Sequence, residues 1–140
     1  MKQVLLSGIT GWLASGTLLV VALLPYLLRP GRLSRALSTP PDSAAPYLRR
    51  MRPHYWLGYA VVAVSTVHAW IPMGAGFARR TNATGLWLAT VALLLLLFQA
   101  GLGRLLQDPA TTERKTLRNM HYWTVAAVIC LLALHVWLNA

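Results

Sequence analysis

Negative charge is nearly absent from this sequence. Only 3 of its 140 residues are Asp or Glu, 13 are Lys or Arg, and charged residues together make up 11% of the chain. A soluble domain carries about a quarter charged residues, whereas 56% of this chain is hydrophobic and its mean hydropathy is +0.52. This composition excludes an ordinary water-soluble core and indicates a protein that lies in membrane lipid.

Cysteine is equally scarce, with Cys130 as the single example. Because it can form no intrachain disulfide, it says nothing about the redox compartment, and we interpret it as a small packing residue. The net charge of +10 raises nucleic acid as a partner. However, the basic residues lie in the gaps between apolar runs and do not form a stripe along a helix, so we expect no nucleic-acid partner.

Four apolar runs divide the chain at about residues 4–28, 54–73, 85–103 and 121–138. A helix needs about 20 apolar residues to cross a membrane, so the sequence predicts an all-α, integral membrane four-helix bundle as a single domain over residues 1–140. The first run is too long for a signal-peptide core and has no small-x-small cleavage site, so we expect it to remain. Pro25 is expected to kink or end it.

The basic residues also predict the topology. The polar segments between the first and second runs and between the third and fourth runs carry ten of them, and the other side carries only Lys2, Arg79 and Arg80. Positive loops stay in the cytoplasm. We therefore expect both termini outside the cytoplasm, with the protein in a bacterial inner (cell) membrane.

All four histidines fall in two copies of one stretch, which are related by a constant offset of 67 in the residue numbering. Each copy begins with His-Tyr-Trp, at His54 and at His121, and has a second histidine further along, at His68 and at His135. Ala60-Val61 and Ala127-Val128 share this register. Outside these stretches, Trp12-Leu13-Ala14-Ser15 resembles Trp87-Leu88-Ala89-Thr90 at an offset of 75, which suggests a weaker repeat of the preceding helices.

The spacing places both histidines of a helix on one face, because 14 residues turn an α-helix by about 40° less than four full turns. They lie about 21 Å apart along the axis, which suits one layer near each membrane face. Since the two helices are predicted to be parallel, His54 shares a layer with His121, and His68 with His135. Two imidazoles facing each other across a bundle are the axial ligands of a six-coordinate b-type haem.

Other roles for the histidines compete with haem. Zinc needs four tetrahedral ligands, and each layer offers two. Copper usually takes Cys or Met as well, and Met51 and Met120 flank the inner histidines, so copper stays open. Histidines at helix ends, beside Tyr and Trp, also suit a simple aromatic belt at the membrane interface. That alternative explains His54 and His121 but not the second histidines or the repeated interval.

Small and basic residues are candidates to support the two haems. A macrocycle between helices needs small residues beside it, and the candidates are Gly11, Gly16, Gly101 and Gly103. Ordinary small-residue packing of membrane helices is the alternative. Haem propionates need cations; the candidates are Arg52 and Arg118 for the inner haem and Arg79 and Arg80 for the outer one.

The four histidines resemble those of the di-haem membrane cytochromes b. The layout is similar to the N-terminal, haem-bearing half of cytochrome b of the bc1 and b6f complexes, and the paired spacing resembles the ferric reductase-like transmembrane family. The resemblance implies two bis-histidine haems b and a respiratory electron-transfer subunit of a larger oxidoreductase. That subunit would conduct electrons between a quinone pool and a redox partner.

The chain also departs from these families. It has no Pro-Glu-Trp-Tyr segment, no second half and no flavin or nicotinamide domain. Asp108 and Glu113 are the only acids near the inner layer and are interpreted as loop residues. Two alternatives remain open: a non-haem membrane anchor or assembly subunit, and a stand-alone transmembrane reductase.

Overall fold

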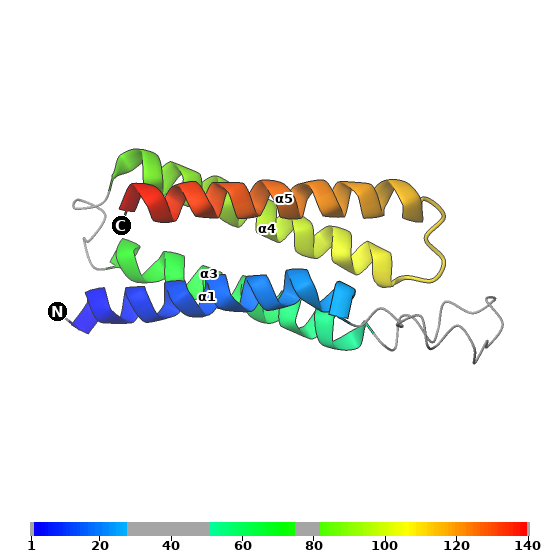
Figure 1. The fold of residues 1–140 in the computed structure, drawn as a ribbon, viewed down its shortest axis with the longest axis horizontal. Helices are drawn as coiled ribbons and strands as arrows, with labels where there is room; N and C mark the ends of the chain where they lie inside the picture. The colour runs from blue at the N-terminus through cyan, green and yellow to red at the C-terminus, as the bar shows by residue number, and fades with distance from the viewer. Residues whose placement is uncertain (1, 28–50, 75–81, 140) are drawn as a thin grey trace.

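The computed structural model describes residues 2–27, 51–74 and 82–139, and these residues form an all-helical bundle without strands. The helices are α1 (Lys2–Leu27), α3 (Arg52–Gly74), α4 (Ala83–Gln107) and α5 (Arg114–Asn139). α1 packs along α3, α4 packs along α5, and contacts between α3 and α4 join the two hairpins (Figure 1). The predicted fold class, an all-α membrane four-helix bundle, is confirmed.

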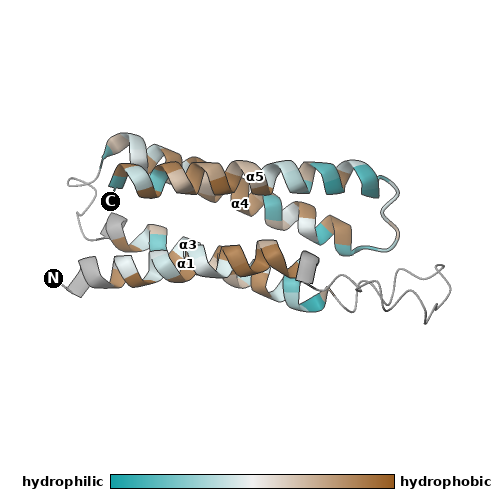
Figure 2. Cartoon of the chain, in the orientation of Figure 1, coloured by the Kyte–Doolittle hydropathy of each residue, from teal (hydrophilic) through white to brown (hydrophobic). Residues whose placement is uncertain are grey.

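Three of the described helices are long and apolar enough to cross a membrane: Gly8–Pro25 within α1, α4, and α5. α3 has 23 residues, which is long enough, but it is not among the three. Its histidine, tyrosine and tryptophan side chains interrupt the apolar run. The sequence predicted four spans, and by length and composition the described residues supply three, with α3 packed among them (Figure 2).

The helices that carry the histidines run in the same direction. α3 and α5 both begin at the end of the bundle where α4 finishes, and both termini of the chain lie at the opposite end (Figure 1). His54 and His121 therefore lie toward one end of the bundle, and His68 and His135 toward the other. This arrangement agrees with the parallel orientation that the basic residues predict.

The connection between α4 and α5 is shorter than the expected polar loop at residues 104–119. It covers only residues 108–113, because α4 continues to Gln107 and α5 already begins at Arg114. The end of α4 is stabilised from this connection. The Asp108 backbone N–H and the Thr111 hydroxyl donate to the Leu105 carbonyl, and Arg114 Nη2 donates to the Leu106 carbonyl at 2.6 Å. These donors satisfy carbonyls that a helix end leaves without partners.

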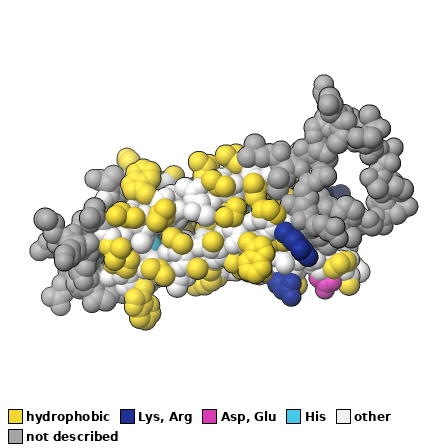
Figure 3. Space-filling model, turned by 90° about the horizontal axis from the view of Figure 1, so that it is seen from below, with side chains coloured by type: hydrophobic (Ala, Val, Ile, Leu, Met, Phe, Trp, Pro, Cys, Tyr) yellow, Lys and Arg dark blue, Asp and Glu magenta, His cyan; other side chains and the backbone are white. Residues whose placement is uncertain are grey.

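Tryptophans cover the outside of the bundle at two levels. Each of the six is at least 69% exposed; they are Trp12, Trp56, Trp70, Trp87, Trp123 and Trp137. On α3 and on α5 the two tryptophans share the interval of the histidines, about 21 Å along the axis. Figure 3 shows hydrophobic side chains over most of one face, with Lys, Arg and acidic side chains gathered at one end. This distribution fits a lipid-facing surface with aromatic belts near its two boundaries.

The centre of the bundle shows that the sequence repeat is also a structural repeat. Four buried residues form the core cluster: Val21, Val61, Leu96 and Val128. Val61 and Val128 are each 1% exposed and are related by the same offset as the two histidine stretches. Val21 and Leu96 are related by the larger offset of the preceding helices. Each hairpin thus contributes equivalent side chains to the contact between hairpins.

Candidate haem site

The structure brings the two inner histidines together. His54 of α3 and His121 of α5 have ring centroids 6.2 Å apart and ring planes inclined by 66°. A metal bound between two imidazole nitrogens at about 2 Å from each needs ring centroids about 6 Å apart. The observed centroid separation is close to that value, and the two rings meet in an edge-on, T-shaped arrangement.

A cavity surrounds this histidine pair. All four helices line it, and the volume that can be compared with known cofactor cavities is about 80 Å³. Cofactor sites commonly enclose about 300–1,000 Å³ and are mostly apolar, so this cavity is smaller than such a site and shares only its apolar character. The lining here is apolar except for a few side chains, which are His54, Tyr55, Tyr59, Gln99, Gln107 and His121. The apolar lining and the two imidazoles give the cavity the character of a site for an apolar ligand.

A hydrogen bond from α1 sets the tautomer of His54. Its Nδ1 lies 3.1 Å from the Val21 carbonyl, which can only accept, so Nδ1 carries the proton and Nε2 carries the lone pair. The carbonyl is available because the residue four positions later is Pro25, which has no N–H to donate to it. Pro25 does not end the helix, since α1 continues to Leu27. Its effect is to free an acceptor for a histidine of α3.

The outer histidines are held in the same way. The Thr10 hydroxyl donates to the Leu6 carbonyl at 2.9 Å, so its oxygen accepts from His68 Nδ1 at 3.1 Å. His135 Nδ1 lies 2.8 Å from the Gly85 carbonyl. Histidines that bind a metal commonly donate their other ring N–H to a carbonyl or similar group, which fixes the tautomer and the ring orientation.

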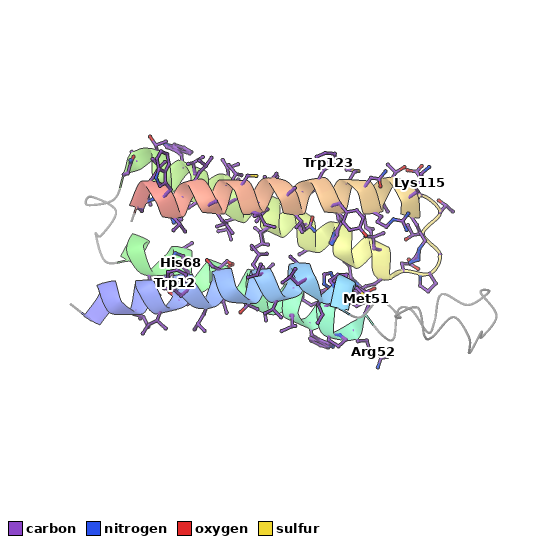
Figure 4. The ribbon with its side chains drawn as sticks, viewed as in Figure 1. Trp12, Met51, Arg52, His68, Lys115 and Trp123 are labelled. Carbon is purple, nitrogen blue, oxygen red and sulfur yellow. The ribbon has the colours of Figure 1, made fainter. Side chains whose placement is uncertain are left out.

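These two outer contacts are equivalent by the repeat. The offset of the histidine stretches relates His68 to His135, and the offset of the preceding helices relates their partners, Thr10 and Gly85. His68 lies where α3 packs on α1 (Figure 4), and its ring lies beside Gly11. Gly85 is buried, and a Cβ at that position would overlap the Asn139 amide, which itself donates to the His135 carbonyl at 2.8 Å. The second repeat has glycine where the first has threonine, and a larger residue at position 85 would have to displace the exposed Asn139 side chain.

The glycine candidates divide into two kinds. A Cβ on Gly11 would lie 3.1 Å from His68 Cε1, and a Cβ on Gly103 would lie 3.7 Å from His121 Cε1. Gly11 allows α1 to approach the ring of His68 closely, whereas the distance at Gly103 is an ordinary van der Waals contact and shows only that α4 lies beside the ring of His121. Gly16 and Gly101 have nothing within 4 Å of the position of a Cβ. Gly101 is exposed, and neither of the two contacts a histidine.

The arginine candidates receive less support from the described residues. Arg52 and Arg118 are exposed, and Arg52 points away from the bundle in Figure 4. Both lie at the end of the bundle nearest the inner histidines. Arg79 and Arg80 lie outside the described residues. Asp108 accepts from the Ala110 N–H at 2.9 Å, as a residue that shapes a turn does.

Zinc and copper, the alternatives to haem, usually take more protein ligands than the two imidazoles of this cavity. No group of three or more His, Cys, Asp or Glu side chains suited to a metal occurs within residues 2–27, 51–74 and 82–139. Of the two methionines considered for copper, Met51 is 6% exposed and Met120 is 42% exposed. Neither of them lines the cavity around the histidine pair. In the described part of the chain this cavity offers two imidazoles, which is the number of axial ligands in a bis-histidine, six-coordinate haem.

Sequence reasoning missed several residues that line the cavity, chiefly Tyr55, Gly58, Tyr59 and Gln99. Gly58 follows His54 by one helical turn, so helical spacing alone places it on the histidine face. It has nothing within 4 Å of a Cβ position. Gln99 is a buried polar side chain within an apolar span, which is a functional signal in membrane helices.

The fold and these contacts define the class of the protein as a four-helix membrane bundle that holds a pair of facing histidines in a cavity. No protein-family model matches this chain, and neither a curated protein nor a solved structure matches it. The case for its function therefore depends on the residues themselves.

The two kinds of glycine make a matched pair for a stability measurement. Gly→Ala inside a helix ordinarily stabilises by up to about 1 kcal/mol, and we expect that gain for Gly16→Ala. Gly11→Ala should lose the gain or destabilise, because its Cβ meets His68 Cε1 at 3.1 Å. Thermal unfolding in detergent measures both. Equal stabilisation by the two substitutions would contradict the close contact between Gly11 and His68.

Proposed function

We propose that the protein is a b-type di-haem membrane cytochrome. The observation that carries the proposal is the inner histidine pair, His54 and His121, whose ring centroids lie 6.2 Å apart in a cavity lined by all four helices. The tautomer that the Val21 carbonyl imposes on His54 supports it, because the lone pair then lies on Nε2. The residues that are present fit a haem with two axial imidazoles.

The second haem is proposed between His68 and His135. Its support comes from the repeat, since both rings are held through Nδ1 by equivalent positions of α1 and α4. The interval between the two histidines of each helix places the second layer about 21 Å from the first. This distance fits within a hydrocarbon layer of about 30 Å.

Haem iron supplies reversible one-electron oxidation and reduction, a chemistry that the histidine side chains do not provide. The role of the protein is then to hold the ligands, fix their tautomers and exclude water. Val21, Val61, Leu96 and Val128 pack together in the middle of the bundle, and Trp side chains cover its lipid-facing surface. Two layers held in this way would allow electrons to cross the membrane.

The partners and the orientation are part of the same proposal. Both termini are proposed to lie outside the cytoplasm of a bacterial cell, with the basic end of the bundle inside. A bundle of this kind would work as a subunit of a larger oxidoreductase. It would exchange electrons with a quinone on one side and with a redox protein on the other.

Removal of one outer histidine should show whether the two proposed haems bind independently. His68→Ala is expected to remove the outer haem and to leave the inner one, so that the reduced-minus-oxidised spectrum of the purified protein falls to about half its b-type amplitude. Val67→Ala is the control, because Val67 is exposed on the same helix. Loss of all haem from His68→Ala at normal protein levels would contradict independent layers.

A larger side chain at Gly58 should block the inner cavity. Gly58→Leu places a side chain in the space beside His54, so we expect loss of the inner haem and retention of the outer one. Gly101→Leu is the control, because it also has open space at its Cβ position but does not line the cavity. Haem content per chain, measured together with a thermal unfolding curve, distinguishes blocking from unfolding. Equal effects of the two substitutions would count against this location of the haem.

The orientation has a direct test. A tag after residue 140 should be digested by protease added to right-side-out vesicles, and a tag in the segment between α4 and α5 should be protected until the vesicles are opened. The reverse pattern would overturn the proposed topology and would move the basic end of the bundle outside.

A further inference from the structure

His121 differs from the other three histidines. His54, His68 and His135 each have a partner at Nδ1, supplied by α1 or α4. His121 Nδ1 is buried and has no hydrogen-bond partner. A buried polar group without a partner is rare in folded proteins, and a ligating histidine usually has one.

The repeat explains why His121 lacks the partner that His54 has. The position equivalent to Val21 in the second hairpin is Leu96, by the offset of the preceding helices. The position equivalent to Pro25 is Ala100, which has a backbone N–H and can donate to the Leu96 carbonyl within α4. No proline frees that carbonyl, so α4 cannot offer His121 the acceptor that α1 offers His54.

A second buried atom without a partner lies in the same cavity. Gln99 is 7% exposed, and its Oε1 is buried with no hydrogen-bond partner. Gln99 and His121 both line the cavity. The two atoms are complementary, because an amide oxygen accepts and Nδ1–H donates. Gln99 also occupies the position equivalent to Leu24, next to the equivalent of Pro25.

The two side chains line one cavity from α4 and α5, and no hydrogen bond joins them in the structure. Gly103 follows Gln99 by one turn of α4, on the same face. A Cβ on Gly103 would lie 3.7 Å from His121 Cε1, so the ring of His121 lies against this part of α4. A rise of about 6 Å separates Gln99 from Gly103 along the helix. That distance suits a side-chain contact or a contact through one buried water.

We propose that Gln99 is the positioning residue of His121, its side-chain carbonyl accepting the His121 Nδ1–H directly or through one buried water while Nε2 binds the haem iron. The inference rests on the proposed haem function. In this arrangement the first hairpin obtains its acceptor from a proline-freed backbone carbonyl, and the second obtains it from a side chain. Gln107 also lines the cavity, but its Oε1 already accepts from Arg104 Nη1 at 3.4 Å.

The test compares Gln99→Leu, Gln99→Glu and Gln107→Leu in the haem-loaded protein. Loss of the acceptor makes the imidazole a poorer electron donor, so Gln99→Leu should raise the midpoint potential of the inner haem and change its low-spin ferric EPR signal. Gln99→Glu keeps an acceptor, and because a carboxylate accepts more strongly than an amide, it should leave the midpoint potential of the inner haem at or below the wild-type value. Gln107→Leu should change neither. The outer haem is an internal control and should stay unchanged in all three variants.

Unchanged inner-haem potential and EPR in Gln99→Leu would overturn the proposal, and so would an equal shift in Gln107→Leu. If Gln99→Leu fails to fold, the midpoint potential of the inner haem in Gln99→Glu decides, because a value above that of the wild type shows that the acceptor does not hold the ring. If the wild-type protein contains no haem, the proposed function fails. The hydrogen bond is then judged separately by the ¹⁵N shifts of the His121 ring in bilayers, where equal shifts in wild type and Gln99→Leu would overturn it.

Discussion

An imidazole inside a membrane must satisfy two ring nitrogens without help from water, and the rest of this structure depends on that constraint. A buried polar group without a partner is costly in hydrocarbon. One nitrogen of His54, His68 and His135 is satisfied by a group on a neighbouring helix. The same contact fixes which nitrogen keeps its lone pair. The packing of α1 on α3 and of α4 on α5 thereby also determines which ring nitrogen carries the proton.

The repeat shows how one arrangement was built twice with different residues. The cores of the two hairpins match, with Val21 equivalent to Leu96 and Val61 to Val128. The acceptors do not match, because Thr10 holds His68 with a hydroxyl whereas Gly85 holds His135 with a backbone carbonyl. Close approach of a helix to a histidine ring is a feature that both hairpins share. A glycine lies at that contact in each, Gly11 against the ring of His68 and Gly103 beside the ring of His121.

The sequence was sufficient to predict the helices, their parallel arrangement and the layer that pairs His54 with His121, because hydropathy and the repeated histidine interval depend only on the chain itself. It was not sufficient for the start of α5 at Arg114, since a charged helix that emerges from the membrane looks like a loop in hydropathy. The sequence also did not show that Gly103 lies beside a histidine and Gly101 does not. That difference depends on which face of α4 points toward α5, and the sequence does not fix it. The sequence predicted that Pro25 would kink or end α1. That Pro25 instead leaves the Val21 carbonyl free for His54 could be recognised only once the structure placed His54 beside that carbonyl.

The most direct measurement of the central claim is the haem content of the purified chain, determined from its reduced-minus-oxidised spectrum together with its iron content. We expect two haems b per chain, both low-spin and six-coordinate in the ferric state, since each iron takes two imidazoles. A chain that is folded in detergent and contains no b-type haem would contradict the proposed function. So would a single haem, or a high-spin ferric signal that shows an open axial position.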